Sequence, residues 1–267
     1  MPGYRDQEYL LNEQYKDATN FSMRVELHRR FSVNKYGWQR WVFDQLRVDE
    51  GGSMLELGCG PGLLWLSNLR RLPADWQITL SDFSPGMLQQ TRQRLGEEHF
   101  TYQVIDAQTI PCSSESVDAI IANHMLYHVP DLSKALGEIR RVLKPGGRFY
   151  ATTIGRQDMR ELNELVRQTL PDLPWQSISL HSPFVLENGQ ELLAPFFAAV
   201  TSLTYEDALE VTEVEPLLAY IRSGSLGSNL NEEQLGALRL RMQQELTTSS
   251  TLHITKSMGI FIASKAE

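Results

Sequence analysis

Residues 55–62 read Leu-Glu-Leu-Gly-Cys-Gly-Pro-Gly, and this stretch is the strongest signal in the sequence. A short apolar segment over 53–57 leads into three glycines at alternate positions, and an apolar helical pattern over 63–72 follows. Glycine adopts positive φ readily, and it has no Cβ to block a ligand that approaches the main chain. The first amides of a helix are hydrogen-bond donors without a partner in the helix. The stretch therefore predicts a buried strand, a ligand-binding loop and a helix.

A dinucleotide-binding loop is the first alternative, because it also joins a strand to a helix through glycines. Its pattern is G-x-G-x-x-G, and counting from Gly58 places Leu63 where the last glycine should stand. Glu56, just before the loop, would also repel a pyrophosphate. A carboxylate there suits a cationic or amine-bearing ligand better. A turn of purely structural glycines is the remaining interpretation.

Strands and helices alternate throughout residues 51–154, as in a parallel α/β unit. Ser84 followed by Pro85 is a favoured helix start, and Asp131 precedes apolar residues with a helical period. The alternation ends after residue 155. Further helices are predicted over 159–170 and 216–221 and from Asn231 onward. The predicted strands are 53–57, 77–81, 100–105, 117–122, 148–154, 198–205 and 252–263.

These motifs resemble those of the class I S-adenosylmethionine (SAM)-dependent methyltransferases, whose first motif is E-x-G-x-G-x-G. The resemblance continues in register through residues 79–84, 106–108, 116–123 and 142–149. It implies an α/β fold with a Rossmann-like, mostly parallel sheet of seven strands and helices on both faces. The last strand would run antiparallel, and the strand predicted over 252–263 fits that place. SAM is the implied cofactor, with S-adenosylhomocysteine as its product.

The resemblance also implies which residues bind SAM. Asp82 follows the second strand and would accept hydrogen bonds from the ribose hydroxyls, while Glu56 would neutralise the positive end of SAM. Asp106 would contact the adenine amine, and Phe83 and Met87 would flank the adenine ring. The predicted cofactor-binding residues are Glu56, Gly58, Cys59, Gly60, Asp82, Phe83, Met87, Asp106, Ala107, Gln108, Asn123, Tyr36 and Trp38.

The candidate catalytic residues follow the fourth predicted strand. Ligands of open α/β sheets lie beyond the carboxyl ends of the strands, so this segment borders the methyl donor. It contains His124, Tyr127 and His128, and either histidine could deprotonate a substrate hydroxyl or acid. The alternative is that His128 belongs to a helix-start motif. The segment lacks the Asp/Asn-Pro-Pro-aromatic motif of amino-methyltransferases that act on nucleic-acid bases.

The charge of the chain is unevenly distributed. The formal net charge of the 267 residues is −8, and nearly all of it lies beyond residue 150. An acidic chain is a poor nucleic-acid or anionic-membrane binder, because phosphate contacts need a basic surface. The acidic segment predicts either a solvated surface that aids solubility or a mouth that attracts a cationic ligand. No Lys or Arg occurs between Arg167 and Arg222, where Glu187, Glu191, Glu206, Asp207, Glu210, Glu213 and Glu215 lie.

We expect four parts: a helical lid over 1–50, a SAM-binding core over 51–155, a cap and substrate region over 156–250 with one sheet strand near 198–205, and a closing strand over 251–267. The lid and the C-terminal insertion would together form a helical cap over the core. Tyr36 and Trp38 are candidates for closing the site over the donor. The candidates for holding the SAM carboxylate are Arg29, Arg30 and Arg40.

The sequence thus predicts an enzyme that transfers a methyl group from SAM to an O, N or C atom of a small molecule by in-line displacement. The alternatives are an RNA methyltransferase and a SAM-binding regulatory module without catalysis. We expect no nucleic-acid or membrane partner, and a monomer or homodimer. The N-terminus has no signal-peptide pattern, and Cys59 and Cys112 have no metal-ligand spacing. These features predict a cytoplasmic protein without a metal site.

Overall fold

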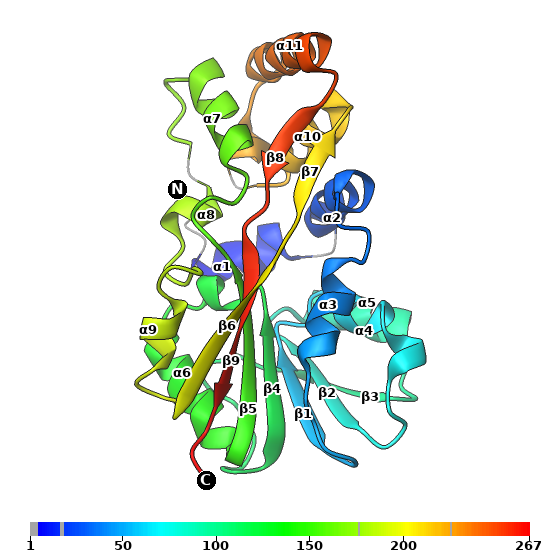
Figure 1. Cartoon of the computed structure of the whole chain (residues 1–267), viewed down its shortest axis with the longest axis vertical. Helices are drawn as coiled ribbons and strands as arrows, with labels where there is room; N and C mark the ends of the chain where they lie inside the picture. The colour runs from blue at the N-terminus through cyan, green and yellow to red at the C-terminus, as the bar shows by residue number, and fades with distance from the viewer. Residues whose placement is uncertain (1–4, 17–18, 176, 225) are drawn as a thin grey trace.

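The computed structural model describes residues 5–16, 19–175, 177–224 and 226–267. The core strands are β1 (Ser53–Leu57), β2 (Gln77–Asp82), β3 (Phe100–Val104), β4 (Val117–Asn123), β5 (Leu143–Ile154), β6 (Ala199–Tyr205) and β9 (Met258–Ser264). They form one seven-stranded sheet in the order β3-β2-β1-β4-β5-β9-β6 (Figure 1). β9 runs antiparallel to β5 and β6, and the pairs among β1–β5 are parallel. The predicted Rossmann-like sheet is confirmed.

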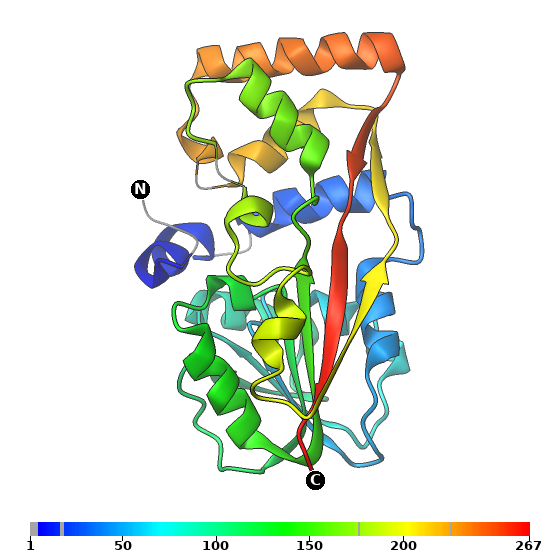
Figure 2. The same ribbon diagram turned by 60° about the vertical axis from the view of Figure 1, so that its left-hand side comes forward.

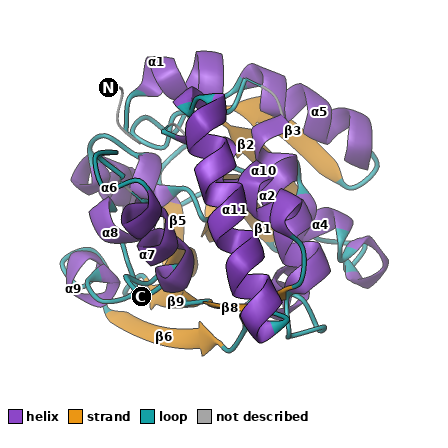
Figure 3. Ribbon diagram, turned by 90° about the horizontal axis from the view of Figure 1, so that it is seen from above, coloured by secondary structure: helices purple, strands orange, loops and turns teal. Residues whose placement is uncertain are grey.

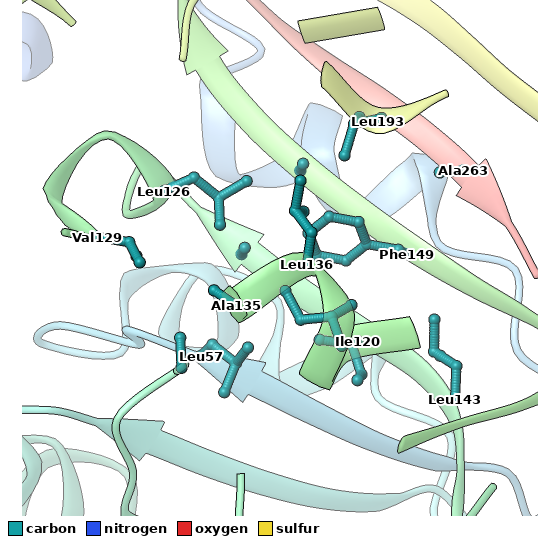
Figure 4. Close-up of a cluster of buried hydrophobic side chains, with 14 of the residues drawn as sticks. Leu57, Ile120, Leu126, Val129, Ala135, Leu136, Leu143, Phe149, Leu193 and Ala263 are labelled. Atoms are coloured by element: carbon teal, nitrogen blue, oxygen red, sulfur yellow. The ribbon is translucent and has the colours of Figure 1, made fainter. Parts of the chain in front are cut away.

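Helices cover both faces of this sheet, because strands of a parallel sheet bury side chains on both sides. On one face α6 and α9 pack around Ile120, Leu136 and Phe149, in the apolar cluster drawn in Figure 4. On the other face α3, α4 and α5 pack around the fully buried Trp65. The helices of the core are α3 (Trp38–Gln45), α4 (Leu63–Leu66), α5 (Pro85–Leu95), α6 (Leu132–Val142) and α9 (Gly189–Leu193).

A cap lies beyond the carboxyl ends of the parallel strands (Figures 1 and 2). Its antiparallel strands β7 (Ala208–Val211) and β8 (Leu252–Thr255) extend the chain directions of β6 and β9. Four helices surround these strands with an apolar core of their own, and α11 crosses the top of the cap (Figure 3). The cap helices are α2 (Thr19–Phe31), α7 (Arg160–Thr169), α10 (Val214–Arg222) and α11 (Glu232–Ser249).

Short helical segments complete the described chain. A segment near the N-terminus lies between core and cap, beside the carboxyl ends of the strands (Figure 2). In the described ranges no helix is both long and apolar enough to cross a membrane. The short segments are α1 (Gln7–Tyr9), a π-helical turn (Leu10–Gln14), 3₁₀ turns (Leu69–Arg71, Leu126–His128 and Gly227–Asn229) and α8 (Ile178–His181).

Three of the predicted helix starts are confirmed with a side-chain cap. Ser84 Oγ accepts a hydrogen bond from the Met87 amide, with Pro85 in the first turn. Asp131 accepts one from the Lys134 amide. Asn231 begins α11 with a reciprocal capping box to Gln234, which satisfies two amides that the helix leaves without partners.

Three local predictions differ from the structure. The strand predicted over 148–154 begins at Leu143. The helix predicted over 63–72 ends at Leu66, and a 3₁₀ turn follows from Leu69. The closing strand predicted over 252–263 is divided at Lys256, because Lys256 and Ser257 bind Asp158 instead of continuing a strand ladder. The first half of that segment therefore belongs to the cap sheet, and the cap contains strands as well as helices.

Candidate functional site

The glycine loop after β1 lies where the strand order reverses, with β2 on one side of β1 and β4 on the other. Open α/β sheets bind ligands at such a point. Gly58, Gly60 and Gly62 all have positive φ, which favours glycine at each position. A Cβ on Gly58 would lie 2.8 Å from Met125, and one on Gly62 would lie 2.7 Å from Thr91. A Cβ on Gly60 would meet no atom within 4 Å, so this residue presents bare backbone to an open space.

That open space is a cavity of about 210 Å³, which we call the loop cavity. Its wall is built from the loop after β1 and from the residues that follow β2, β3 and β4. The structure brings twelve of the predicted site residues together here: Gly58, Cys59, Gly60, Asp82, Phe83, Met87, Asp106, Ala107, Asn123, His124, Tyr127 and His128.

Asp82 ties the glycine loop to the start of α5. Its carboxylate accepts a hydrogen bond from the Gly60 amide at 2.9 Å and another from the Ser84 amide at 2.8 Å. Burial raises the pKa of this carboxyl. The Phe83 amide also donates to this carboxylate. Because a carboxylate has about four acceptor positions, about one remains for a ligand hydroxyl at the cavity wall.

Glu56 does not reach the loop cavity, contrary to the role we predicted for it. Its side chain is 1% exposed and accepts a hydrogen bond from the Trp65 indole N–H at 2.5 Å. Burial raises the pKa of Glu56 to about 8, so the carboxyl is mostly protonated at neutral pH. The side chains of a strand alternate between faces, and this residue points to the sheet face that α4 covers.

Three other predicted cofactor residues also lie outside the loop cavity. The Gln108 amide donates to the Asp106 carboxylate at 3.1 Å, and its oxygen accepts from the Asp131 amide. Gln108 therefore shapes the loop around Asp106. Tyr36 is exposed, with its hydroxyl on Asp44. Tyr36 and Trp38 line a second cavity instead.

The second cavity, which we call the cap chamber, has a volume of about 690 Å³ and is walled by both core and cap. It adjoins the loop cavity, since eight residues line both. A ligand in the chamber would therefore lie beside a ligand in the loop cavity. The shared residues are Tyr15, Phe21, Arg24, Gln39, Leu63, His124, Tyr127 and His128.

All three candidate catalytic residues lie at this junction, in different electrostatic settings. His124 has positive φ, and its amide donates to the Thr152 hydroxyl. Burial and the charge of Lys256 lower the pKa of His124 to about 3, which makes it a poor proton acceptor at neutral pH. Burial raises the pKa of Tyr127 well above its usual range. His128 Nε2 is 2.9 Å from the Tyr15 hydroxyl.

Arg24 on α2 was not among the predicted site residues, yet it lines both cavities. Its Nε is buried without a hydrogen-bond partner in the described chain. None of the predicted alternatives lines the loop cavity. Arg29, which pairs with Glu26, and Arg40 line only the chamber. Arg30 pairs with Glu213 and lines neither cavity. The sequence does contain a signal for Arg24, because the α2 residues that line the chamber recur at helical spacing. They are Phe21, Arg24, Val25 and His28.

A buried ion pair in the chamber wall was also not predicted. Lys256 Nζ lies 2.6 Å from Asp158 Oδ1, and the two side chains are 2% and 6% exposed. The same carboxylate oxygen accepts a hydrogen bond from the Ser257 amide. Asp158 follows β5, and Lys256 lies between β8 and β9. The pair therefore joins two of the segments through which the chain passes between core and cap. Its only sequence signal is a lysine inside a predicted strand.

The acidic segment does not form the mouth of the chamber. Of the seven acidic residues between Arg167 and Arg222 that we singled out, only Asp207 lines the chamber. The described wall has two carboxylates, Asp158 and Asp207, against a larger set of cations. The cations are Arg24, Arg29, Lys35, Arg40 and Lys256.

Glu56→Gln should change how stability depends on pH and leave ligand binding unchanged. The wild-type carboxyl keeps its proton to about pH 8 in the fold, whereas the unfolded chain releases it near pH 4.5. Wild-type stability therefore falls between these values, by up to about 1.4 kcal/mol per pH unit. The amide oxygen of Gln can still accept the bond from Trp65, and it does not titrate.

Urea unfolding of both proteins from pH 4 to 9 measures this effect. The stability gained by the variant should grow with pH up to about 8 and then level off. Parallel pH profiles for the two proteins would contradict the shifted pKa. If Glu56→Gln instead loses much of its affinity for S-adenosylhomocysteine, Glu56 takes part in ligand binding.

Comparisons with known proteins agree with this architecture. Residues 55–151 match the family model described as a methyltransferase domain. The ubiquinone/menaquinone biosynthesis C-methyltransferase UbiE of Desulfotalea psychrophila is 34% identical over 111 residues, which are 42% of this chain and 45% of that protein. UbiE of Idiomarina loihiensis is 29% identical over 153 residues, covering 56% and 58%. The chain spans about half the length of these curated relatives.

Solved structures show the same fold. Phosphoethanolamine N-methyltransferase 2 of Haemonchus contortus, in complex with S-adenosyl-L-methionine, superposes with a TM-score of 0.61 at 19% identity. The match covers 100% of this chain and 61% of that one. At this level of identity the likeness concerns the fold, including the strand order that places the glycine loop.

Proposed function

We propose that this chain, whose residues 55–151 form a class I SAM-dependent methyltransferase domain, transfers the methyl group of SAM to a small molecule held in the cap chamber. The observation that carries the proposal is the junction of the two cavities, where the loop cavity, whose wall contains the glycine loop with its methyltransferase motif, adjoins a chamber of about 690 Å³. Chambers of that size, enclosed between two layers of structure, are typical of small-molecule sites.

The residues around the loop cavity fit SAM. Gly60 exposes backbone to the cavity, and we assign the remaining acceptor position of Asp82 to a ribose hydroxyl. Asp106 lines the cavity, and we assign its carboxylate to the adenine amine. Arg24 offers a buried, unpaired N–H for the carboxylate of the amino-acid part. We assign this last role to Arg24 because it alone among the arginines lines both cavities in the described chain.

When bound, SAM supplies a methyl group that is already activated for in-line displacement. The chain therefore mainly has to orient the acceptor and exclude water. The cap and α2 provide the enclosure. Where the acceptor atom carries a proton, His128 is the better-placed base, because the low pKa of His124 leaves that side chain little basicity.

The finer parts of the proposal concern partners and location. We propose a monomer or homodimer that binds neither nucleic acid nor membranes and works in the cytoplasm. The net charge of −8 supports the proposal that the chain binds neither nucleic acid nor membranes, since nucleic acids and anionic membranes attract basic surfaces. The enclosed chamber also favours a small acceptor over an RNA chain.

Calorimetric titration and a labelling assay together test the proposed function. S-adenosylhomocysteine should bind one site per chain. Methyl-labelled SAM, incubated with the protein and a cell extract, should place label in small molecules when products are separated by mass. Label confined to RNA would favour the RNA methyltransferase alternative, and binding without any labelled product would favour a regulatory module. No binding of S-adenosylhomocysteine would contradict all three functions.

A further inference from the structure

We propose that the methyl acceptor is a small, ring-bearing organic anion and that Lys256 in the wall of the cap chamber binds its negatively charged oxygen. This inference rests on the proposed function and adds the chemical class of the substrate. It is carried by the buried lysine, by a buried donor without an acceptor, and by the balance of charges and rings around the chamber.

Lys256 is the first part of the case. An ammonium group has three N–H donors, and the described chain satisfies one of them, through Asp158 at 2.6 Å. The side chain is 2% exposed and lines the chamber. Its charge lowers the pKa values of His28 and His124, after the larger effect of burial. Lys256 therefore lies near His124, which also borders the loop cavity.

Trp38 supplies a second donor at the same wall. Its indole N–H is buried without a hydrogen-bond partner in the described chain, and its ring centroid is 5.0 Å from that of His124. A buried donor without an acceptor costs free energy. Three buried side-chain polar atoms lack partners in the described ranges. The Arg24 N–H is assigned above to the SAM carboxylate, which leaves the Trp38 N–H for a ligand of the chamber. Such a site lacks acceptors, which a ligand rich in oxygen supplies.

The surroundings select the charge and shape of that ligand. With the pairs Lys256–Asp158 and Arg29–Glu26 left out, three cations remain in the described chamber wall against one carboxylate, Asp207. A pocket lined by one sign of charge concentrates ligands of the opposite sign. Flat side chains complete the wall and favour a conjugated or aromatic body. They are Tyr15, Phe21, Trp38, Tyr127, Trp175 and Tyr220.

Benzoate and its neutral isostere benzamide test this inference directly. We titrate the wild-type protein, saturated with S-adenosylhomocysteine, with each probe and follow binding by ligand-observed NMR. Benzoate should bind about tenfold or more tightly than benzamide, since hydrogen bonds to charged groups are the stronger ones. D158N, which removes the carboxylate that competes for Lys256, should bind benzoate at least as tightly as the wild type.

The double variant D158N/K256M should lose the preference for benzoate while it binds S-adenosylhomocysteine as the wild type does. The side-chain amide oxygen that D158N introduces can still accept the hydrogen bond from the Ser257 amide. Because both charges are removed, the double variant contains no buried charge without a partner. K134M is the matched control, because Lys134 is exposed on α6 and lines neither cavity. It should keep the full preference.

Equal affinities of the wild type for the two probes would overturn the inference, as would a preference that D158N/K256M retains. A labelling assay on extract fractions separated by anion exchange gives an independent answer. Label in the anionic fraction supports the inference, whereas label only in neutral or cationic fractions overturns it and leaves the methyltransferase function standing. Failure of S-adenosylhomocysteine to bind would instead contradict the proposed function itself.

Discussion

Asp82→Ala should weaken the binding of S-adenosylhomocysteine by about 1.5–3 kcal/mol, roughly 10- to 150-fold in Kd. We assign the carboxylate to the ribose in the proposed function, and it also accepts hydrogen bonds from the Gly60 and Ser84 amides at 2.9 and 2.8 Å. The variant therefore loses both a ligand contact and the support of the glycine loop. Calorimetry measures the loss, and a circular dichroism spectrum like that of the wild type shows that the sheet is intact.

A matched variant separates the ribose contact from a general disturbance of the cavity. R24M should also weaken S-adenosylhomocysteine binding, because Arg24 is assigned to the carboxylate of the amino-acid part. It should leave 5′-methylthioadenosine, which has the ribose but no carboxylate, bound as in the wild type. D82A should weaken both ligands. If D82A binds either ligand normally, Asp82 acts only as a structural link between the glycine loop and the residue that begins α5.

The residues around the loop cavity were predictable because local rules govern them. A strand followed by spaced glycines and a helix has a fixed geometry, and the strand order brings Asp82, Asp106 and Asn123 to the same edge. A local rule also explains why Glu56 does not line the loop cavity. Alternation along β1 places it on the sheet face that contains Met54, under Trp65, although its position next to the loop suggested a ligand contact.

The chamber could not be predicted in this way, because contacts distant in sequence build it. Asp158 and Lys256 are 98 positions apart, and each is an ordinary charged residue in its own segment. The interpretation of the acidic segment as a mouth for a cationic ligand was wrong for a related reason. Counting charges along a chain does not show which side chains face a cavity, and here one of the seven acids we singled out faces the chamber.

Lys256→Met should lower the free energy of unfolding by about 3–5 kcal/mol, because removal of one partner leaves a buried charge without compensation. The side chain of Asp158 is 6% exposed, so water cannot replace the lost ammonium. Urea denaturation at neutral pH measures the change through the midpoint at constant slope. The exposed pair Arg239–Glu215 offers a control, since R239M should change stability by about 1 kcal/mol or less.

The double variant D158N/K256M decides what the buried pair is for. Replacement of both members of such a pair by neutral groups of similar size is often neutral or stabilising, so we expect it to recover most of the stability that K256M loses. A pair that neutral residues replace without loss of stability serves another purpose, and its place in the wall of the cap chamber makes that purpose ligand binding. If the double variant is instead as unstable as K256M, the pair holds core and cap together. If K256M alone is as stable as the wild type, Asp158 is not a buried charge that needs Lys256.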